Sequence, residues 1–556
     1  MIKINQIKMP PGYRNEQIKA HIAKQLHLSG ESIKDVRILK ESIDARKKPD
    51  VFYTLSVVFS CDRETEIIKK YSKKADISFY EERTVAFPKV DLQEVGDQPV
   101  VIGAGPAGLF CAYYLAKAGL RPVLLERGKA VESRMKDVER FWETGILDRE
   151  SNVQFGEGGA GTFSDGKLNT LNKDPLGYQR EILSLFVQMG ADPAVLYEQK
   201  PHLGTDKLVS IVRNLRQEII RLGGEVRFEA KVTDILLENC HGWKSADDAA
   251  GHMAHMEENE KDMAVRGIVI NGSEKLFSGH IVLAIGHSAR DTFSMLSDRN
   301  FPMEAKAFAV GYRVQHPQRA IDISQYGSEN LGKFPPAPYK LTAHAENGRS
   351  VYSFCMCPGG YVVNSSSEEG RLCINGMSYS DRGGENANSA IIISVTPEDF
   401  EDRGSLSGMY FQRELEKKAY EAARGVIPVQ RLEDYRLNRA SREEGSIRPC
   451  MKGEYAFANL RGILPDSLEE AFLDGMEQFG RKIPDFDHKD TILAGIEART
   501  SSPVRITRDK RCEAITVKGV YPCGEGAGYA GGITSAAADG LRVAIALMED
   551  LGGEKK

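Results

Sequence analysis

The 556-residue chain has no long apolar run free of glycine and proline, no apolar N-terminal segment and no regular cysteine framework. Its longest uncharged stretch, Pro99 to Ala116, approaches the length of a membrane span but contains three glycines and Pro106. The first six residues include a lysine and an asparagine and lack the core of a signal peptide. The nine cysteines are scattered, apart from Cys355 and Cys357, which fits reduced thiols better than disulfides. We therefore expect a cytoplasmic protein without a membrane partner.

The net charge is small and unevenly distributed. With 41% hydrophobic and 28% charged residues, the composition is that of a globular protein of two or three domains. The formal charge is −5, yet residues 1–90 hold 18 Lys and Arg against 12 Asp and Glu, so this segment carries +6. A basic segment on an acidic body could bind an anionic partner such as nucleic acid. An ordinary solvated surface explains so modest an excess more simply.

A glycine-rich turn follows the short apolar strand expected at Val100 to Ile102. Gly103, Gly105 and Gly108 form the pattern G-x-G-x-x-G between this strand and a helix that runs to about Lys117. The first glycine allows the tight turn, the second lets the backbone approach a pyrophosphate, and the third allows close helix–strand packing. The helix N-terminus then faces the phosphate anion.

A second apolar strand, expected at residues 122–125, delivers a carboxylate. Glu126 follows it directly and lies 23 residues after Gly103. This is the position of an acidic residue that accepts hydrogen bonds from the ribose hydroxyls of an adenosine. Strand, turn, helix, strand and acid together predict a dinucleotide site, which a lone glycine pattern would not.

Two further matches to the glycine pattern start at Gly156 and at Gly526. The first follows a poor strand, residues 152–155, and the second follows a good strand, Val520 to Cys523, with too little chain left for another βαβ unit. We therefore predict one Rossmann-type unit. The other two segments are glycine-rich loops, and loops of this kind can still contact a cofactor.

The first ninety residues are expected to form a separate module, here called the N-terminal module (residues 1–90). The patterns of apolar residues predict strands at 2–8, 36–43, 51–60 and 77–80 and helices at 15–28 and 64–71. This βαββαβ order is that of a ferredoxin-like fold. Such sheets sometimes bind RNA, but the aromatic-basic RNP1 pattern is absent. Residues 44–50 are expected to be an exposed hairpin loop, and residues 91–97 a polar linker.

The remaining chain alternates helical and strand patterns. We expect a helix at 206–222, strands at 225–237 and 265–270, a buried strand at 277–286, and a closing strand and helix at 520–523 and 534–548. Residues 300–480 contain both patterns and are interpreted as a substrate or cap domain. His252 and His255 lie in a polar insert without a third ligand, so we expect surface histidines and no metal site.

Three separated segments, around 100–126, 281–286 and 520–534, together resemble the FAD-binding domain of glutathione-reductase-type flavoproteins that have a single dinucleotide domain. The resemblance implies FAD as cofactor, with the ADP half near the first motif and the flavin half near the C-terminal helix. Glu525 stands where such proteins usually have an aspartate. The implied FAD contacts are Gly103, Gly105, Pro106, Ala107, Gly108, Glu126, Arg127, Gly158, Gly159, Val232, Gly286, Gly524, Glu525, Gly532 and Ile533.

The whole chain is similar to a bacterial family of uncharacterised FAD-dependent dehydrogenases, through the stretches 42–49, 155–167, 286–292, 354–360 and 524–532. This similarity implies an α/β fold: a Rossmann-like FAD-binding domain, an inserted mixed α+β substrate or cap domain and an N-terminal ferredoxin-like domain. The expected boundaries are 1–90 for the module, 98–300 and 486–556 for the FAD-binding domain, and 301–485 for the cap.

A flavin of this kind carries out hydride or electron transfer itself, so the expected activity is that of an oxidoreductase acting on a small-molecule substrate. With one Rossmann unit, NAD(P)H is expected only as a transient electron donor. His287 and Arg290 are candidates for acid–base or anchoring roles, although stabilising their loop is the simpler role. The alternative is a flavin-carrying protein whose N-terminal module binds RNA or protein. The substrate and the oligomeric state are left open.

Cys355 and Cys357 raise the question of a redox dithiol. Residues two apart in an extended strand point to opposite faces, which opposes a disulfide bridge. Pro358 and Gly359 follow and could start a turn one residue early. The sequence favours buried structural thiols.

Overall fold

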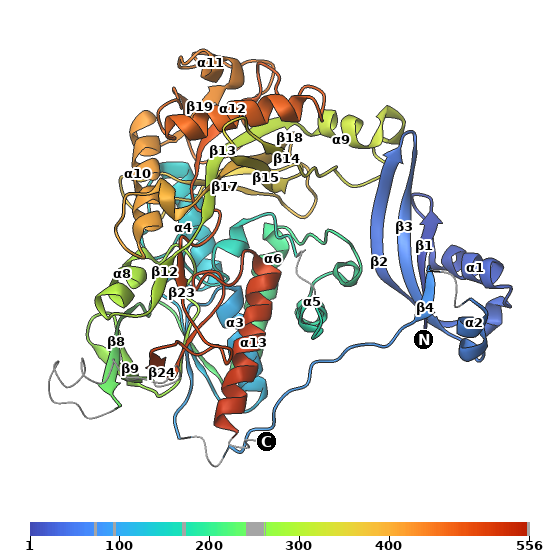
Figure 1. The fold of residues 1–556 in the computed structure, drawn as a ribbon, viewed down its shortest axis with the longest axis horizontal. Helices are drawn as coiled ribbons and strands as arrows, with labels where there is room; N and C mark the ends of the chain where they lie inside the picture. Colours follow the sequence, from blue (N-terminus) through green and yellow to red (C-terminus); the bar gives the residue numbers. More distant parts are fainter. Residues whose placement is uncertain (72–74, 93–95, 169–173, 241–260, 262, 553–556) are drawn as a thin grey trace.

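The computed structural model describes residues 1–71, 75–92, 96–168, 174–240, 261 and 263–552. His252 and His255 lie outside these residues, so their surface position stays a prediction. No helix in the described part of the chain is long and apolar enough to cross a bilayer. The N-terminal module, blue in Figure 1, stands beside a larger body made of all later elements.

The N-terminal module contains a four-stranded antiparallel sheet in the order β2-β3-β1-β4. Its apolar face, including Ile4 and Leu55, packs on Ile22 and Ile67 of the two helices. The expected element order βαββαβ is observed. The elements are β1 (Ile2–Met9), α1 (Asn15–Leu26), β2 (Lys34–Lys47), β3 (Asp50–Ser60), α2 (Glu64–Lys70) and β4 (Ile77–Phe79).

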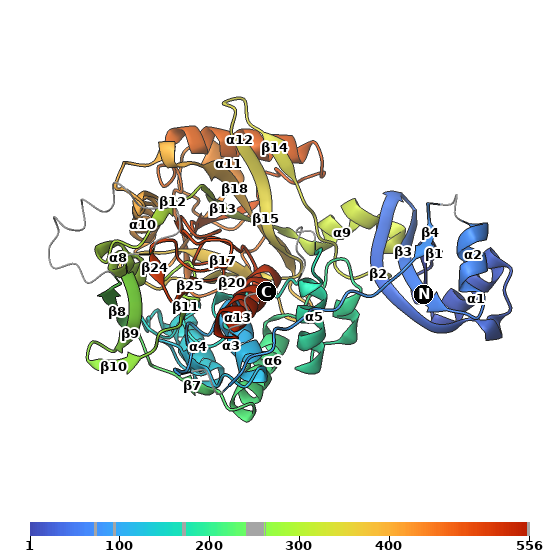
Figure 2. The same cartoon turned by 60° about the horizontal axis from the view of Figure 1, so that its bottom comes forward.

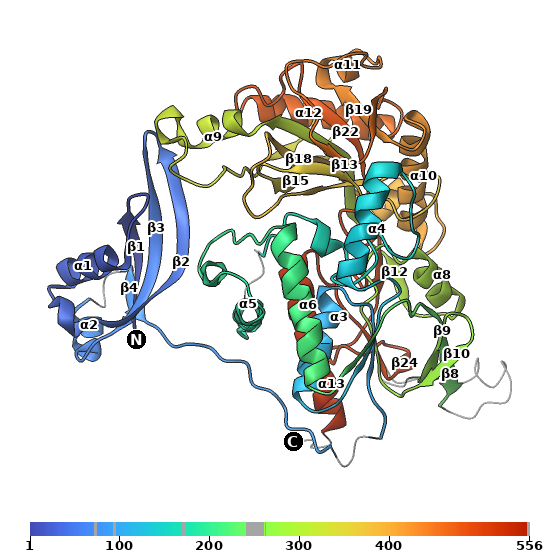
Figure 3. The same ribbon diagram turned by 180° about the vertical axis from the view of Figure 1, so that it is seen from behind.

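The β2–β3 hairpin joins the module to the body, as seen on both sides in Figures 1 and 3. Residues 46–50 are exposed as expected, but β2 and β3 extend through most of the expected loop, so that the turn is only two residues long. Asn330 Nδ2 donates to the Pro49 carbonyl over 2.8 Å, and the Tyr53 ring lies 5.3 Å from that of Phe334. Near the end of the module, Phe87 stacks on Tyr114 at 5.4 Å. The backbone of Glu41 also exchanges hydrogen bonds with Tyr197 and Gln199, so the module is anchored at the hairpin, along β2 and near residue 87.

A five-stranded parallel sheet in the order β25-β11-β5-β6-β7 forms the Rossmann-like part of the body. One face is covered by α3, α6 and α13, which explains their long apolar stripes. The strands are β5 (Val100–Ile102), β6 (Val123–Leu125), β7 (Glu225–Arg227), β11 (Ile281–Leu283) and β25 (Val520–Pro522). The helices are α3 (Pro106–Lys117), α6 (Thr205–Arg221) and α13 (Ile533–Leu551).

A smaller sheet of β8 (Val232–Asn239), β9 (Met263–Ile270), β10 (Glu274–Phe277) and β24 (Val517–Lys518) packs on the opposite face of the parallel sheet. Two expected strands are corrected here. Residues 225–237 divide into β7 and β8, and residues 277–286 divide between β10 and β11. Phe277 is 68% exposed, and the Ser278 hydroxyl donates to the Gln98 carbonyl, so the chain turns between the sheets. An apolar run does not reveal such a change of sheet.

The second large sheet has seven strands in the order β14-β15-β18-β13-β22-β19-β21. Figure 2 shows it on the side of the body away from α3 and α6. Strand β22 belongs to this sheet because it pairs with both β13 and β19. The sheet therefore extends beyond the expected cap boundary at residue 485. The strands are β13 (Phe308–Pro317), β14 (Thr342–His344), β15 (Ser350–Cys357), β18 (Asn386–Val395), β19 (Ile427–Arg431), β21 (Tyr455–Phe457) and β22 (Ile492–Glu497).

Two small sheets and the remaining helices complete the body. The small sheets are β17-β16-β20 (Ile374–Met377, Tyr361–Asn364, Met451–Lys452) and β12-β23 (Met303–Ala305, Val504–Ile506). The helices are α4 (Val131–Thr144), α5 (Tyr178–Gln188), α8 (Arg290–Asp298), α9 (Gln318–Tyr326), α10 (Ser407–Ala422), α11 (Leu432–Arg436) and α12 (Asp466–Gly480).

Candidate functional site

The three glycines of the first turn have different surroundings. A Cβ added to Gly103, at φ +101°, would lie 2.4 Å from the Ala284 carbonyl oxygen, and one added to Gly108 would lie 1.8 Å from the Gly103 oxygen. At Gly105 the nearest atom would be the Gly159 Cα, at 3.9 Å. The first and third glycines are therefore required by packing. The space in front of Gly105 is open, as a pyrophosphate would need.

The Glu126 carboxylate, 5% exposed, connects three backbone segments. It accepts hydrogen bonds from the N–H groups of Ala104 at 2.8 Å, Gly128 at 2.9 Å and Gly156 at 3.0 Å. A carboxylate has about four acceptor positions, so capacity for a ribose hydroxyl is left. Its expected place at the end of β6 is observed, and its contact with the 156–161 loop is a feature that the sequence did not reveal.

The glycine-rich loop is held by Arg134, which sequence reasoning missed. This fully buried side chain of α4 donates to five backbone carbonyls, each over 2.7–3.2 Å. Those carbonyls belong to Asn152, Val153, Gly156, Glu157 and Gly159. The available signal was an arginine within the apolar stripe formed by Val131, Val138 and Phe141 of a helix. A buried arginine without a direct acidic partner indicates an organised backbone turn.

The C-terminal glycines bring a second helix N-terminus to the same place. A Cβ on Gly524 would lie 2.6 Å from the Ala107 Cβ, and one on Gly161 would lie 3.0 Å from Ile533. A Cβ on Gly159 would lie 3.1 Å from the Gly105 Cα. The N-termini of α3 and α13 and the 156–161 loop thus converge, and two positive helix ends at one point form a site for an anion. Pro106, Gly158 and Gly532 lie in these same segments.

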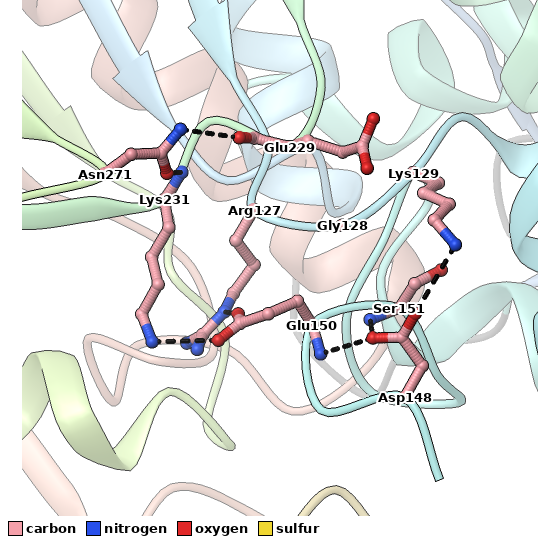
Figure 4. A pocket seen from close by; sticks show the side chains of 9 residues that line it. All are labelled: Arg127, Gly128, Lys129, Asp148, Glu150, Ser151, Glu229, Lys231 and Asn271. Carbon is pink, nitrogen blue, oxygen red and sulfur yellow. Dashed lines mark hydrogen bonds and ion pairs between the residues drawn. The ribbon is translucent and has the colours of Figure 1, made fainter. Parts of the chain in front are cut away.

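A pocket of about 410 Å³ opens beyond Glu126 and is shown in Figure 4. Its cations are paired: Arg127 binds Glu150 at 2.6 Å and Asp291 at 2.8 Å, Lys231 binds Glu150 at 2.9 Å, and Lys129 binds Asp137 at 2.8 Å. Val232, the first residue of β8, follows the pocket residue Lys231. The lining residues are Arg127, Gly128, Lys129, Asp148, Glu150, Ser151, Glu229, Lys231 and Asn271. Of the residues expected near the adenosine, Arg127 lines this opening, and Glu126 and Val232 are each next in sequence to a residue that lines it.

His287 and Glu525 face each other at the ends of β11 and β25. His287 Nδ1 lies 3.6 Å from Glu525 Oε1. Burial, with help from the charges of Arg499 and Arg290, lowers the pKa of His287 to about 3. Burial raises the pKa of Glu525 to about 7, against the opposing charge of Lys306. At neutral pH the histidine is uncharged and the carboxyl group is poised between its two forms, which suits Glu525 for proton exchange. Gly286 packs against Gly526: a Cβ added to Gly526 would lie 2.4 Å from the carbonyl oxygen of Gly286.

Arg290, the other catalytic candidate, lies in a buried ion network. Only 2% exposed, it binds Glu416 of α10 at 2.7 and 2.8 Å, and Gln412 at 3.1 Å. Arg499 binds the same Glu416 through two bonds of 2.8 Å. Burial raises the pKa of Glu416, but the two arginines together lower it below its ordinary value. These contacts support a role in joining the parallel sheet to the second sheet.

Known protein families match three parts of the chain. Residues 307–500 match the family "FAD-dependent protein, C-terminal domain-like", residues 101–154 match "NAD(P)-binding Rossmann-like domain", and residues 1–60 match a domain of unknown function (DUF8436). The Rossmann match covers the turn around Gly105 and the Glu126 carboxylate. FAD is the cofactor that the matches and the geometry support together.

Solved structures show only distant likeness. An L-proline dehydrogenase from P. horikoshii is 12% identical, with a TM-score of 0.34 over 82% of this chain and 94% of its own. A geranylgeranyl bacteriochlorophyll reductase-like protein from Thermoplasma acidophilum is 13% identical, with a TM-score of 0.33 over 81% of this chain and 78% of its own. At these scores the likeness carries no argument about function.

One relative covers nearly the whole chain. An uncharacterised protein of Clostridium beijerinckii is 44% identical over 552 residues, which are 99% of this chain and 98% of that protein. The chain belongs to the same bacterial family as this protein, a family of FAD-dependent oxidoreductases with a Rossmann-like nucleotide-binding unit.

Proposed function

We propose that the protein is a flavoenzyme of the glutathione-reductase type with one dinucleotide domain, acting as a dehydrogenase on a small organic substrate. One observation carries the proposal: the N-termini of α3 and α13 and the 156–161 loop converge in front of Gly105, the glycine with open space. A pyrophosphate there would receive N–H groups and two positive helix ends. When bound, FAD supplies the hydride or electron transfer, and the protein binds and orients it.

The ADP half of the cofactor would lie along the end of the parallel sheet. The Glu126 carboxylate would accept a ribose hydroxyl in its remaining acceptor position. Val232, buried at the start of β8 and next to the opening lined by Arg127, would contact the adenine. The three cations of that opening, Arg127, Lys129 and Lys231, are all paired with carboxylates. None of them is left to bind a phosphate group on the ribose, which supports a site for the uncharged adenine ring.

The flavin half would lie between the parallel sheet and the seven-stranded sheet. The positive end of α13, at Gly532 and Ile533, would stabilise negative charge on the pyrimidine edge of the ring. Gly524 and Glu525 would contact the ribityl chain, and the pKa of Glu525 near 7 suits it to hold or release a proton there. His287, neutral and beside Glu525, would accept or donate a hydrogen bond without adding charge.

We further propose that residues 1–90 form a ferredoxin-like domain and that residues 98–300 and 486–556 surround an inserted substrate domain. The element order βαββαβ and the strand order β2-β3-β1-β4 support the first statement. The return of the chain from the seven-stranded sheet to β25 supports the second. NAD(P)H would act only as a transient donor, since the described residues contain one Rossmann-like sheet.

The test is flavin spectroscopy of the full chain. We expect a yellow protein that takes up FAD and whose flavin absorbance bleaches anaerobically with one member of a panel of small organic reductants. NADH and NADPH should bleach it slowly or leave it unchanged. A protein that shows no flavin spectrum and takes up no FAD would refute the cofactor site. Fast, saturable bleaching by either nicotinamide would refute the dehydrogenase proposal and indicate an NAD(P)H-dependent reductase.

A further inference from the structure

Cys355 and Cys357 lie at a bulge near the end of β15. Along β18, Phe354 pairs with Ala390 and Cys357 pairs with Asn388, so three steps on β15 oppose two on β18. The extra residue is accommodated by Cys355, whose φ is +43°. A bulge of this kind turns a side chain out of the regular alternation. The regular alternation on which the expectation of opposite faces depended is therefore absent here, because the pairing with β18 breaks the period of two.

The bulge brings the two cysteines close enough for the pKa of each thiol to depend on the other. Cys357 is completely buried, and its Sγ lies 3.2 Å from the Cys355 carbonyl oxygen, whereas Cys355 is partly exposed. Of the two residues, Cys355 is therefore the more exposed. This arrangement differs from that of an isolated structural thiol such as Cys373, which is buried against Ser365.

Two cations surround the pair. Arg313, fully buried, donates to the Cys355 carbonyl at 3.1 Å and lies 3.9 Å from Cys357 Sγ, while Glu497 holds its other side at 2.7 Å. Lys167 donates to the Met356 carbonyl and pairs with Asp165 at 2.8 Å. The hydrogen bond from Cys357, then Lys167 and Arg313, lower the pKa of Cys355 against burial and the charge of Asp165.

The opposite effect operates on the second sulfur. Burial and the hydrogen bond to Cys355 raise the pKa of Cys357 well above that of a free thiol. The pair thus contains one sulfur that favours the thiolate and one that keeps its proton. A reactive thiolate beside a protonated partner is the arrangement that thiol–disulfide exchange requires.

The pair also lies close to the flavin side of the proposed cofactor site. Lys167 contacts Met356, and the next residue, Leu168, accepts a 2.7 Å hydrogen bond from Thr534 Oγ1 in the first turn of α13. The charge of Cys355 also contributes to the raised pKa of Glu525. The segment 165–168 therefore connects the part of β15 that carries the two cysteines with the first turn of α13.

We propose that Cys355 and Cys357 form a redox-active dithiol whose substrate class is small-molecule disulfides, with Cys355 as the attacking sulfur. This inference rests on the proposed flavoenzyme function for its supply of electrons. The Cys355 thiolate attacks one sulfur of the disulfide, forming a mixed disulfide and releasing one thiolate. Cys357 transfers its proton to that thiolate and attacks Cys355 Sγ, which forms the Cys355–Cys357 disulfide and releases the second thiol as its thiolate. Two electrons and two protons from reduced FAD restore the dithiol.

The test uses the full-length protein in a Cys240→Ser background, because Cys240 is an exposed thiol, with a pyridyl disulfide as probe. We expect rapid release of two pyridinethione molecules per chain, no retained adduct, and a 355–357 peptide lighter by two hydrogen atoms. Cys357→Ser should release one and retain the adduct on Cys355. Cys355→Ser should lose the rapid phase. Cys450→Ser is the matched control, because Cys450 is also partly exposed but has a pKa raised by burial.

Flavin absorbance recorded in parallel separates this inference from the proposed function. A protein that binds FAD but releases no more thione than Cys355→Ser, or that keeps a stable adduct with both cysteines present, would overturn the dithiol and leave the flavoenzyme standing. If a variant fails to fold, the peptide mass of the parent protein after treatment with oxidised glutathione decides: an unchanged dithiol mass overturns the proposal. If the protein neither contains nor takes up FAD and yet forms the 355–357 disulfide, the dithiol is supported, and the proposed supply of electrons from FAD is refuted.

Discussion

Arg134 donates a 2.9 Å hydrogen bond to the carbonyl of Gly159, the glycine whose Cα lies against Gly105. The helix α4 therefore fixes the loop that faces the first nucleotide turn, although none of the five carbonyls that Arg134 binds belongs to that turn. A cation fully buried among backbone carbonyls can be exchanged for a neutral side chain only at a cost to stability and to the shape of the loop.

We expect Arg134→Met to weaken FAD binding by at least tenfold and to lower the free energy of unfolding by about 3–5 kcal/mol, because it leaves buried carbonyls without donors. Thermal unfolding and FAD titration measure the two effects. Arg140→Met on the exposed side of the same helix is the control, since Arg140 is 52% exposed and should change neither value appreciably. Equal behaviour of the two variants would contradict the anchoring role.

Alanine substitutions at the glycines of the first turn should distinguish an effect on FAD binding from an effect on protein packing. Gly105→Ala adds a methyl group with no close neighbour in the protein, so stability should change by less than about 1 kcal/mol while FAD uptake is lost. Gly108→Ala should destabilise the protein by about 1–3 kcal/mol or more, because its Cβ would lie 1.8 Å from the Gly103 oxygen. Gly279→Ala, with open space and no nearby ligand, is the neutral control. Normal FAD uptake by Gly105→Ala would refute the pyrophosphate position.

Glu525 should make stability depend on pH. Its pKa in the folded chain is raised from 4.5 to about 7, so its contribution is fully present below pH 4.5 and is lost as the pH rises through 7. Glu525→Gln removes this loss, and we expect the variant to be more stable than the parent by about 1–3 kcal/mol at pH 8 and equal to it near pH 4.5. Denaturant unfolding across this range measures the difference. Glu549→Gln on the exposed side of α13 should give none, and a pH-independent difference for Glu525→Gln would contradict the assignment.

The N-terminal module should be separable if the linker is kept. Removing residues 1–80 while retaining 81–97 leaves the Phe87–Tyr114 stack intact, so the fragment should still bind FAD. A fragment that starts at residue 98 exposes Tyr114 and the apolar surface under the linker, and we expect it to aggregate more readily. Flavin content and light scattering compare the two. Loss of flavin from the longer fragment would mean that the contacts of residues 1–80 with the body, at Asn330 and at residues 197–199, are essential to it.

The local parts of the nucleotide site were predictable from the sequence. The order of strand, glycines and helix from Val100 to Lys117, the carboxylate Glu126 and the closing helix α13 were all expected and are observed within a few residues. These features depend on short-range geometry: the 3.6-residue period, glycine turns and a fixed spacing within one βαβ unit. The local sequence contains that information.

What the sequence did not reveal depends on distant partners. The Cys355 bulge exists because β15 pairs with β18, more than thirty residues later in the chain. The division of 277–286 between two sheets depends on Gln98, which accepts the Ser278 hydroxyl. Arg134 resembles any amphipathic arginine until the 152–159 carbonyls are placed around it. These pairings join residues that lie far apart in the chain, so the local pattern of a single sequence does not reveal them.

Arg290 and Arg499 hold Glu416 between them where the parallel sheet meets the seven-stranded one. Any hinge motion that separated α8 from α10 would leave these buried charges without partners, at a cost of several kcal/mol. We therefore expect this edge to stay closed throughout turnover. Substrate and product must then enter and leave at another edge of the site.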